Sequence, residues 1–276
     1  MEGATAVLDV PSGGVPDAAA KVREQVAGRP IVALGGGRVI DAAKALGGAD
    51  GLPVAAIPTT LSGAPFTRVH RMPAGVDEPA MVRPALVIAD AALMASQPMP
   101  DLAGSAMNSL AHATESLYVP LANPVATMAA LRAASLFASG LADPREPRPD
   151  HLALAALLGS WAVGTTGFAI HHVVCQTLVG ALGLPHARTN AVMLPHTVRF
   201  MAMRAPDAIE ALRKAIGGDV ADLAATSGAT TLGELGVEEP QIDAVVEAAS
   251  RRPDLANTPG GAPTPERLRA FVQAAL

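Results

Sequence analysis

The sequence predicts an α/β N-terminal domain built on a parallel sheet, followed by an all-α C-terminal domain. In the first 98 residues, short apolar runs alternate with helical patterns, which is typical of a parallel sheet. From Asp101 onward, apolar residues recur at helical spacing and no strand pattern is present. Half of the 276 residues are apolar, yet only five Phe, one Tyr and one Trp occur. A core built mainly from Ala, Val, Leu and Met favours closely packed helices.

The α/β domain is predicted from three apolar runs and the helical segments that follow two of them. Strands are expected over residues 31–34, 54–57 and 85–89, and helices over residues 39–46 and 91–97. Pro98-Met99-Pro100 interrupts the pattern and marks the domain boundary. We therefore assign residues 1–98 to the α/β domain and residues 99–276 to the helical domain.

The helical domain is divided by proline-rich and glycine-rich breaks. These breaks fall at residues 120–124, 143–149 and 217–218, and a loop over 257–263 leads to a closing helix over 265–275. Residues 152–187 contain no Asp, Glu, Lys or Arg, and the part from Leu152 to Ile170 has about the length of a membrane span. Because Gly159 and the run Gly164-Thr165-Thr166-Gly167 interrupt this stretch, we interpret it as a buried helix pair and expect no membrane partner.

Charge and cysteine content exclude several classes of protein. The net charge is −5 and no basic run occurs, so nucleic acid is not an expected partner. The single cysteine, Cys175, excludes a disulfide framework and fits a reducing compartment. The N-terminus lacks the basic and apolar regions of a secretory signal, so we expect a cytoplasmic protein. An uncovered edge of the short sheet would favour a homodimer.

Two loops at strand ends are candidate ligand-binding segments. Gly35-Gly36-Gly37 lies between a predicted strand and a predicted helix, where free backbone N–H groups can bind a phosphate. Pro58-Thr59-Thr60, followed by Ser62-Gly63, places hydroxyl groups at the end of the next strand. Ligands of parallel sheets bind at this edge. Each motif alone fits a tight or polar turn equally well.

The candidate catalytic cluster lies in the helical domain. Asn108 and His112 are four residues apart and share one face of a helix, while His172 and His186 would converge on them from a helix and the loop after it. Imidazole and amide groups suit either a divalent metal or an anionic substrate, and an amide at position 108 weakens metal binding relative to a carboxylate. The alternative is a set of hydrogen-bonded core histidines.

Other polar residues are given plainer interpretations. Arg68, His70 and Arg71 could bind an acidic group, but a solvated loop explains them equally well. His196 is interpreted as structural or capping, and Cys175 as a small buried side chain, because no cation is adjacent in sequence.

These motifs together resemble the iron-containing alcohol dehydrogenase family, and most of all its maleylacetate reductase branch. The resemblance extends from about Val32 to near Gly236. It rests on Ala33-Leu34-Gly35-Gly36-Gly37, Ile40-Asp41-Ala42-Ala43-Lys44-Ala45, Ala56-Ile57-Pro58-Thr59-Thr60, Met107-Asn108-Ser109-Leu110-Ala111-His112-Ala113 with Glu115, Ala122-Asn123-Pro124, His171-His172, Cys175, Leu184-Pro185-His186 and Asn190-Ala191-Val192-Met193-Leu194-Pro195-His196.

The resemblance implies a dehydroquinate synthase-like fold in which a nucleotide-binding α/β domain and a helical domain enclose the substrate. It implies that Gly36 and Gly37 face a dinucleotide pyrophosphate. In metal-using members, the positions matching Asn108, His112, His172 and His186 hold iron or zinc, and the first of them is Asp. Maleylacetate reductases are similar to this chain in carrying Asn there, and they are generally regarded as working without the metal. The three histidines would then bind or polarise the substrate.

The chain departs from the family pattern at several positions. The first strand and helix of the family's nucleotide-binding domain are missing from the sequence, so we expect a truncated sheet. Arg38 stands where the family has Ser, and Gly63-Ala64-Pro65 stands where it has Gly-Ser-Glu. Gln176 replaces a histidine four residues after His172, and a glutamine cannot transfer a proton near neutral pH. These departures make NAD(P) binding possible but doubtful, and Asn108 leads us to expect no divalent metal, Fe or Zn.

The resemblance implies an oxidoreductase that reduces a ketone or enone of a small acidic molecule with a nicotinamide cofactor. The alternative is a repurposed non-redox enzyme, an isomerase, cyclase or lyase, that uses the same cleft without NAD(P) or metal. The candidate catalytic residues are Asn108, His112, His171, His172, Gln176 and His186, and the candidate cofactor-binding residues are Gly35, Gly36, Gly37, Arg38, Thr59 and Thr60.

Overall fold

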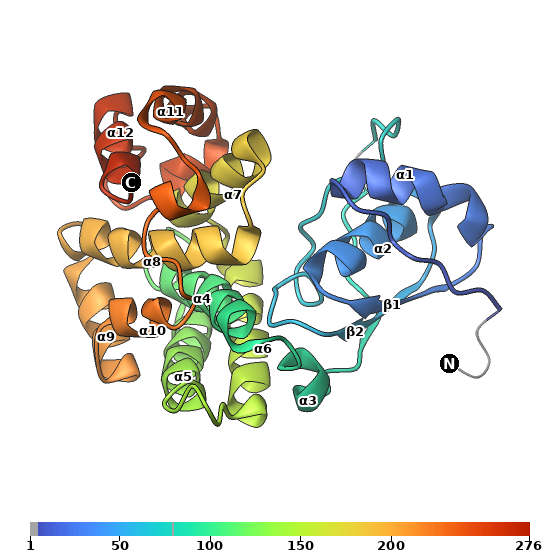
Figure 1. Ribbon diagram of the computed structural model, residues 1–276, viewed down its shortest axis with the longest axis horizontal. Coiled ribbons are helices and arrows are strands. Elements are labelled where there is room, and N and C mark those ends of the chain that lie inside the picture. Colours follow the sequence, from blue (N-terminus) through green and yellow to red (C-terminus); the bar gives the residue numbers. More distant parts are fainter. Residues whose placement is uncertain (1–4, 79) are drawn as a thin grey trace.

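The computed structural model describes residues 5–78 and 80–276 and divides into an α/β lobe and a helical lobe (Figure 1). The α/β lobe contains α1 (Val15–Val26), β1 (Ile31–Gly35), α2 (Gly37–Asp50), β2 (Val54–Pro58) and β3 (Leu86–Val87). The short helix α3 (Ala91–Met94) follows β3 and leads to the helical lobe. The predicted combination of an α/β part and an all-α part is confirmed for the described residues.

The sheet is parallel and small, as the apolar runs predict. Its strand order is β1-β2-β3, with Ile31 opposite Val54 and Ala55 opposite Leu86. The third strand is shorter than its apolar run predicts, because only two of its residues pair with β2. Helix α1 has no counterpart in the sequence-based prediction.

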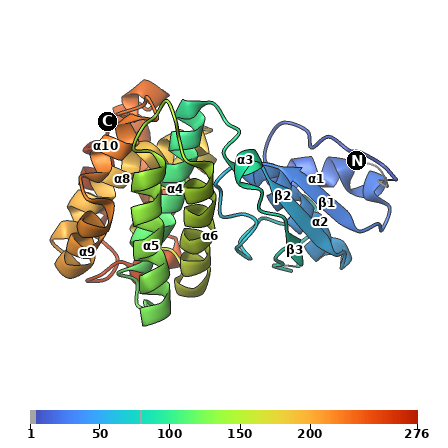
Figure 2. The ribbon, with the colours of Figure 1, turned by 90° about the horizontal axis from the view of Figure 1, so that it is seen from below.

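One face of this sheet carries exposed apolar side chains. Helix α2 covers the other face and α1 packs against α2, while Figure 2 shows the strands from the uncovered side. On that side Val32 is 66% exposed and Leu86 is 56% exposed, whereas Ala33, which points to the helices, is 4% exposed. Leu34 and Ile88 are also exposed. Apolar side chains in such a contiguous arrangement indicate a surface that another element covers.

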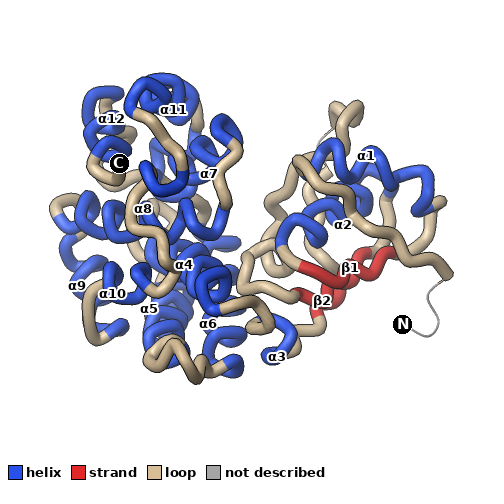
Figure 3. The backbone as a smooth tube through the Cα atoms, viewed as in Figure 1, coloured by secondary structure: helices blue, strands red, loops and turns tan. Residues whose placement is uncertain are grey.

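The helical lobe forms the larger part of the chain, and Figure 3 shows no strand in it. Its helices are α4 (Met99–Ser116), α5 (Pro124–Gly140), α6 (Pro149–Thr166), α7 (Ile170–Leu182), α8 (His186–Ala202), α9 (Pro206–Ile216), α10 (Val220–Ala225), α11 (Ile242–Ser250) and α12 (Pro265–Gln273), with 3₁₀ turns η1 (Gly233–Leu235), η2 (Glu239–Gln241) and η3 (Pro253–Asn257). Helix α4 packs against α5, α6 and α8, and every residue from Leu102 to Ser116 is buried. The polar residues of α4 are therefore placed inside the lobe, where they need partners.

The charge-free stretch consists of two helices rather than one. Helix α6 ends at Thr166, Gly167 adopts φ 87°, and α7 starts at Ile170. Among the described residues, no single helix has the length and apolarity of a membrane span; α6 and α7 satisfy those criteria only together, and they are bent by 101°.

Candidate active site

The site begins on α4, which presents Asn108, His112 and Glu115 from one side. Spacings of four and three residues place these side chains on successive turns of the same helix face. Each residue is at most 5% exposed. Small residues around them permit close packing. Gly159 of α6 lies so close to α4 that a Cβ atom added to it would be only 2.9 Å from the Ser109 carbonyl oxygen.

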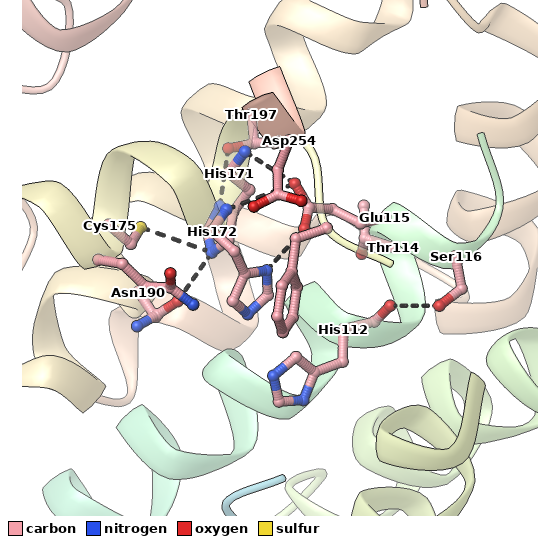
Figure 4. A network of polar contacts seen from close by, with 12 residues as sticks. His112, Thr114, Glu115, Ser116, His171, His172, Cys175, Asn190, Thr197 and Asp254 are labelled. Carbon is pink, nitrogen blue, oxygen red and sulfur yellow. Dashed lines mark hydrogen bonds and ion pairs between the residues drawn. The ribbon is translucent and has the colours of Figure 1, made fainter. Parts of the chain in front are cut away.

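Glu115 connects α4 to the first turn of α7. Its Oε1 accepts hydrogen bonds from the backbone N–H groups of His171, at 2.8 Å, and His172, at 3.4 Å. Its Oε2 lies 2.7 Å from Nδ1 of His172 (Figure 4). With Glu115 ionised, we assign the proton of His172 to Nδ1, which leaves the lone pair of Nε2 available.

The imidazoles of His112 and His172 stack on one another beneath an aromatic cover. Their ring centroids are 4.6 Å apart and their planes differ by 13°. The Phe168 ring lies 4.7 Å from that of His172, and Asn257 fixes it by donating a 2.8 Å hydrogen bond to the Phe168 carbonyl. This cover removes water from one side of the histidine pair.

Three buried acceptor atoms at this place have no partner among the described residues: Asn108 Oδ1, His112 Nδ1 and His172 Nε2. Buried polar atoms without partners are costly, so this arrangement indicates that a ligand completes the site. Two imidazole nitrogens and an amide oxygen suit a divalent cation in their chemistry. The described residues contain no group of three or more His, Cys, Asp or Glu side chains placed to hold a metal, so Asn108 is needed to complete a donor set.

Burial keeps the histidines neutral and makes the carboxyl group harder to ionise. Desolvation lowers the pKa of His172 to about 3 and that of His112 well below its usual value. Desolvation also raises the pKa of Glu115 to about 7, against the opposing effects of His171 and the backbone N–H groups. Neutral imidazoles are the form that binds metals and accepts hydrogen bonds.

His171, predicted as part of the catalytic set, turns away from the other histidines. Its Nδ1 lies 2.8 Å from Thr197 Oγ1 and its Nε2 lies 3.0 Å from Asn190 Oδ1, and both partners are on α8. With both ring nitrogens engaged, this geometry suits a structural role that holds α7 against α8. Cys175 is fully buried beside it, and burial raises the pKa of the thiol, so the thiol is not a ready nucleophile.

His186 and Gln176 lie around the buried pair. Gly183 in the left-handed conformation ends α7, and α8 starts at His186, which remains exposed. Desolvation nevertheless lowers the pKa of His186, and its ring is close enough to lower that of His172. Gln176 lies one turn after His172 and accepts a 2.8 Å hydrogen bond from Arg252 Nη2.

The glycine turn lies beside the loop that leads to the histidines. A Cβ at Gly36 would lie 2.9 Å from the Thr60 side chain, and one at Gly37 would lie 2.9 Å from Ser62 Oγ. Further along the loop, a Cβ at Gly63 would lie 2.8 Å from Cε1 of His112. The close packing and the α2 N-terminus at Gly37 fit the pyrophosphate of a dinucleotide.

The other predicted cofactor residues have structural contacts. Thr59 N–H donates to the Gly35 carbonyl at 3.0 Å. Arg38 is exposed, and its guanidinium donates to the carbonyls of Val10 and Pro11. Arg38 therefore fastens the N-terminal segment across the start of α2.

Several site residues received no role from the sequence. Glu115 belongs to the recognised motif, three residues after His112, but only the fold reveals its partner. Phe168 lies in the turn just before α7, and Arg252 reaches Gln176 from 76 residues further along the chain. Ser160 Oγ lies buried near Gly63, without a partner among the described residues. Lys44 is fully buried and donates to Asp41 and to the carbonyls of Ala64 and Val69, which holds the loop beyond Gly63 in place.

A separate hollow of about 980 Å³ opens on the helical lobe, away from these residues. It is lined by His196, Arg199, Phe200, Arg267 and Phe271 among others, and none of the candidate catalytic residues contributes to it. We therefore do not assign the reaction to this hollow, despite its size.

Comparison with known proteins gives consistent matches along the chain. Residues 6–98 match the family model "Iron-containing alcohol dehydrogenase", and residues 102–275 match "Fe-containing alcohol dehydrogenase family, C-terminal". Maleylacetate reductase 1 of Rhodococcus opacus is 37% identical over 238 residues, which cover 81% of this chain and 67% of that protein. Maleylacetate reductase of Pseudomonas aeruginosa is 34% identical over 250 residues, covering 85% of this chain and 71% of that protein.

The fold is also similar to that of a solved relative. The crystal structure of maleylacetate reductase from Rhizobium sp. strain MTP-10005 superposes with a TM-score of 0.81 at 31% identity. The match covers 94% of this chain and 78% of the other.

These comparisons correct the cofactor expectation drawn from the sequence. The matching family is that of the iron-containing alcohol dehydrogenases, whose members use NAD(P) and a metal, so the expectation of doubtful NAD(P) binding and no metal was wrong. That expectation rested on the missing first strand and helix, on Arg38 and Gly63-Ala64-Pro65, and on the amides of Asn108 and Gln176. The structure adds the carboxyl group of Glu115 directly behind His172, which can supply the negative charge that Asn108 lacks.

Proposed function

The chain belongs to the iron-containing alcohol dehydrogenase family, and on that premise we propose that it transfers a hydride from NAD(P)H to a ketone or enone of a small acidic molecule. The observation that carries the proposal is the trio of unpaired buried acceptors on Asn108, His112 and His172, at the end of the loop that starts beside the glycine turn. The chain is an enzyme of the oxidoreductase class by its family.

Each proposed role follows from position. Gly36 and Gly37 bind the pyrophosphate, and the loop from Thr60 to Gly63 places the nicotinamide near His112. Asn108, His112 and His172 would hold a divalent metal, whereas His186, the fourth predicted ligand, is not grouped with these two histidines in the described part of the chain. When bound, such a metal polarises the substrate carbonyl as a Lewis acid, and NAD(P)H supplies the hydride. We also propose the boundary at residues 98–99, because α4 begins at Met99.

The protein's own groups prepare this chemistry. Glu115 keeps the Nε2 lone pair of His172 directed into the site, and Phe168 excludes water from it. In the low-dielectric interior, interactions with a developing alkoxide are stronger than in water. After hydride transfer, a proton from solvent completes the reduction by protonating the alkoxide formed from a ketone or the enolate formed from an enone.

We expect purified protein to oxidise NADH or NADPH in a 1:1 ratio with consumption of maleylacetate, the substrate named for its relatives. Absorbance at the reduced-nicotinamide band and product analysis check this stoichiometry. Consumption of the substrate without NAD(P)H oxidation would instead establish the non-redox isomerase, cyclase or lyase. Absence of binding of both NADH and NADPH at millimolar concentration in a thermal-shift titration would also contradict the reductase.

We further propose that two copies associate through the uncovered sheet face. Light scattering should give a mass of twice 27.8 kDa, and Val32→Lys should shift it toward 27.8 kDa, because a buried lysine would oppose the contact. Met203→Lys is the matched control, since Met203 is 90% exposed on the other lobe. A monomeric wild-type protein, or a dimer unaffected by Val32→Lys, would rule out this interface.

A further inference from the structure

Beyond the histidines, one face of α7 is approached by two cationic side chains. His172, Gln176 and Gly180 are four residues apart and therefore lie along one stripe of the helix, about 6 Å apart per step. Arg252, which precedes η3, donates from Nη2 to Gln176 Oε1 at 2.8 Å. A Cβ added at Gly180 would lie 3.6 Å from Nη2 of Arg71. The stripe thus runs from a catalytic imidazole past two guanidinium groups.

Arg252 is close enough to act on the site electrostatically. Its charge contributes to the lowered pKa of His172, after desolvation and the effect of His186. The Arg252 side chain is 32% exposed, and its one carboxylate partner, Asp254, is loosely placed at 3.5 Å and 41% exposed. An incoming carboxylate could replace Asp254 without leaving a buried charge unpaired.

The backbone around Arg71 is held in place by its neighbours. His70 lies 3.1 Å from the Arg71 carbonyl oxygen through Nδ1 and accepts from the Val82 N–H at 3.0 Å through Nε2. Lys44 fastens the preceding residues through the carbonyls of Ala64 and Val69. This loop is therefore organised, and among the described residues no carboxylate lies within ion-pair distance of the Arg71 guanidinium. In Figure 1, α7 lies on the side of the helical lobe that faces the α/β lobe.

We propose that Arg252 and Arg71 form a carboxylate-binding edge along α7 that selects dianionic substrates. Arg252 binds the carboxylate nearer to the reacting carbonyl, and Arg71 binds the one farther from it. Gln176, in place of a proton-transferring group, orients the Arg252 guanidinium. A guanidinium presents paired donors that match a carboxylate, and a second cation distinguishes a dicarboxylate from a monocarboxylate. The inference rests on the proposed function for the position of the substrate carbonyl.

The test measures binding of maleate, an unreactive dicarboxylate, by calorimetry to wild-type and variant protein. Arg252→Ala should weaken maleate binding by about 10- to 100-fold, in line with the loss of a charge-assisted contact. Arg71→Ala should weaken maleate binding but leave crotonate, a monocarboxylate, within about twofold. Arg251→Ala is the matched control, because Arg251 is exposed and pairs with Glu247 on α11. Asp254→Asn should tighten maleate binding, since it removes the competing carboxylate.

Unfolding curves by circular dichroism show whether each variant is folded, and Arg252→Lys provides a second variant that keeps the charge. Unchanged maleate binding in folded Arg252→Ala protein, or equal losses for Arg251→Ala, would overturn the proposal. Failure to bind maleate in the wild type would do the same. Because binding is measured without NAD(P)H, this test is independent of the redox assay. If maleate binding depends on Arg252 but no nucleotide is oxidised, the reductase is rejected and the carboxylate edge is kept. If Arg252→Ala protein reduces the substrate as fast as the wild type, the carboxylate edge is rejected and the reductase is kept.

Discussion

Replacing His172 with asparagine is expected to lower kcat/KM by about 1000-fold while the protein remains folded. The Nδ2 group of asparagine can replace Nδ1–H of His172 as the donor to Glu115, now 2.7 Å away, but asparagine has no counterpart of Nε2. The substitution therefore removes the unpaired acceptor from the site and preserves the buried hydrogen bond behind it. Steady-state kinetics with NAD(P)H and the metal content of the purified protein would be measured together.

His172→Ala gives a second measure of the same position. It should lose as much activity, and it should also unfold at lower urea, because Glu115 then keeps only its backbone partners. His151→Ala is the matched control: His151 lies on α6, bonded to Ser139, and should retain nearly full activity. If His172→Asn retained more than about a tenth of the wild-type rate, His172 would not be a catalytic residue, since a lost general acid–base or electrostatic group costs more than this.

The sequence was sufficient to predict the order of the elements but not all of them. Runs such as Ile31–Gly35 and Val54–Pro58 are apolar throughout because both faces of a parallel strand are usually covered. Helix α1 was missed, although Ala18, Val22 and Val26 recur every four residues. Charged residues between them weakened the pattern, and the buried face becomes evident only against α2.

The sequence names candidate site residues but does not give their orientation. Sequence spacing cannot decide which of His171 and His172 faces α4, because adjacent helical residues differ by about 100° in direction. The packing of α8 decides it, by engaging both nitrogens of His171. Glu115 and Arg252 contact groups 57 and 76 residues away, so no local pattern reveals their roles.

Replacing Glu115 with glutamine is expected to lower kcat/KM by about 10- to 100-fold, the usual cost of losing the group that orients a ligand histidine. Glutamine can still accept the backbone N–H of His171, but it is neutral and no longer makes His172 more basic. Glu115→Ala should lose more activity and also stability, because it leaves the first N–H groups of α7 without an acceptor. Glu210→Gln, at an exposed ion pair on α9, is the control. Wild-type kinetics in Glu115→Gln would contradict a positioning role.

The same substitution separates the carboxyl group from the histidines in the pH dependence of stability. In metal-free protein, the folded pKa of Glu115 is about 7 against an ordinary value of 4.5, so the folded state holds this proton more tightly. Its contribution to stability is therefore fully present below pH 4.5 and is lost as the pH rises through 7. The histidines have lowered pKa values and act in the opposite direction, but they are common to both proteins and cancel in the difference. The difference in free energy of unfolding, Glu115→Gln minus wild type, should therefore increase between pH 5 and pH 7.5. The increase is at most about 1.4 kcal/mol per pH unit. Urea denaturation at the two pH values measures this difference. If the difference is the same at both, Glu115 is ionised throughout, and its charge is fully stabilised by His172 and the start of α7.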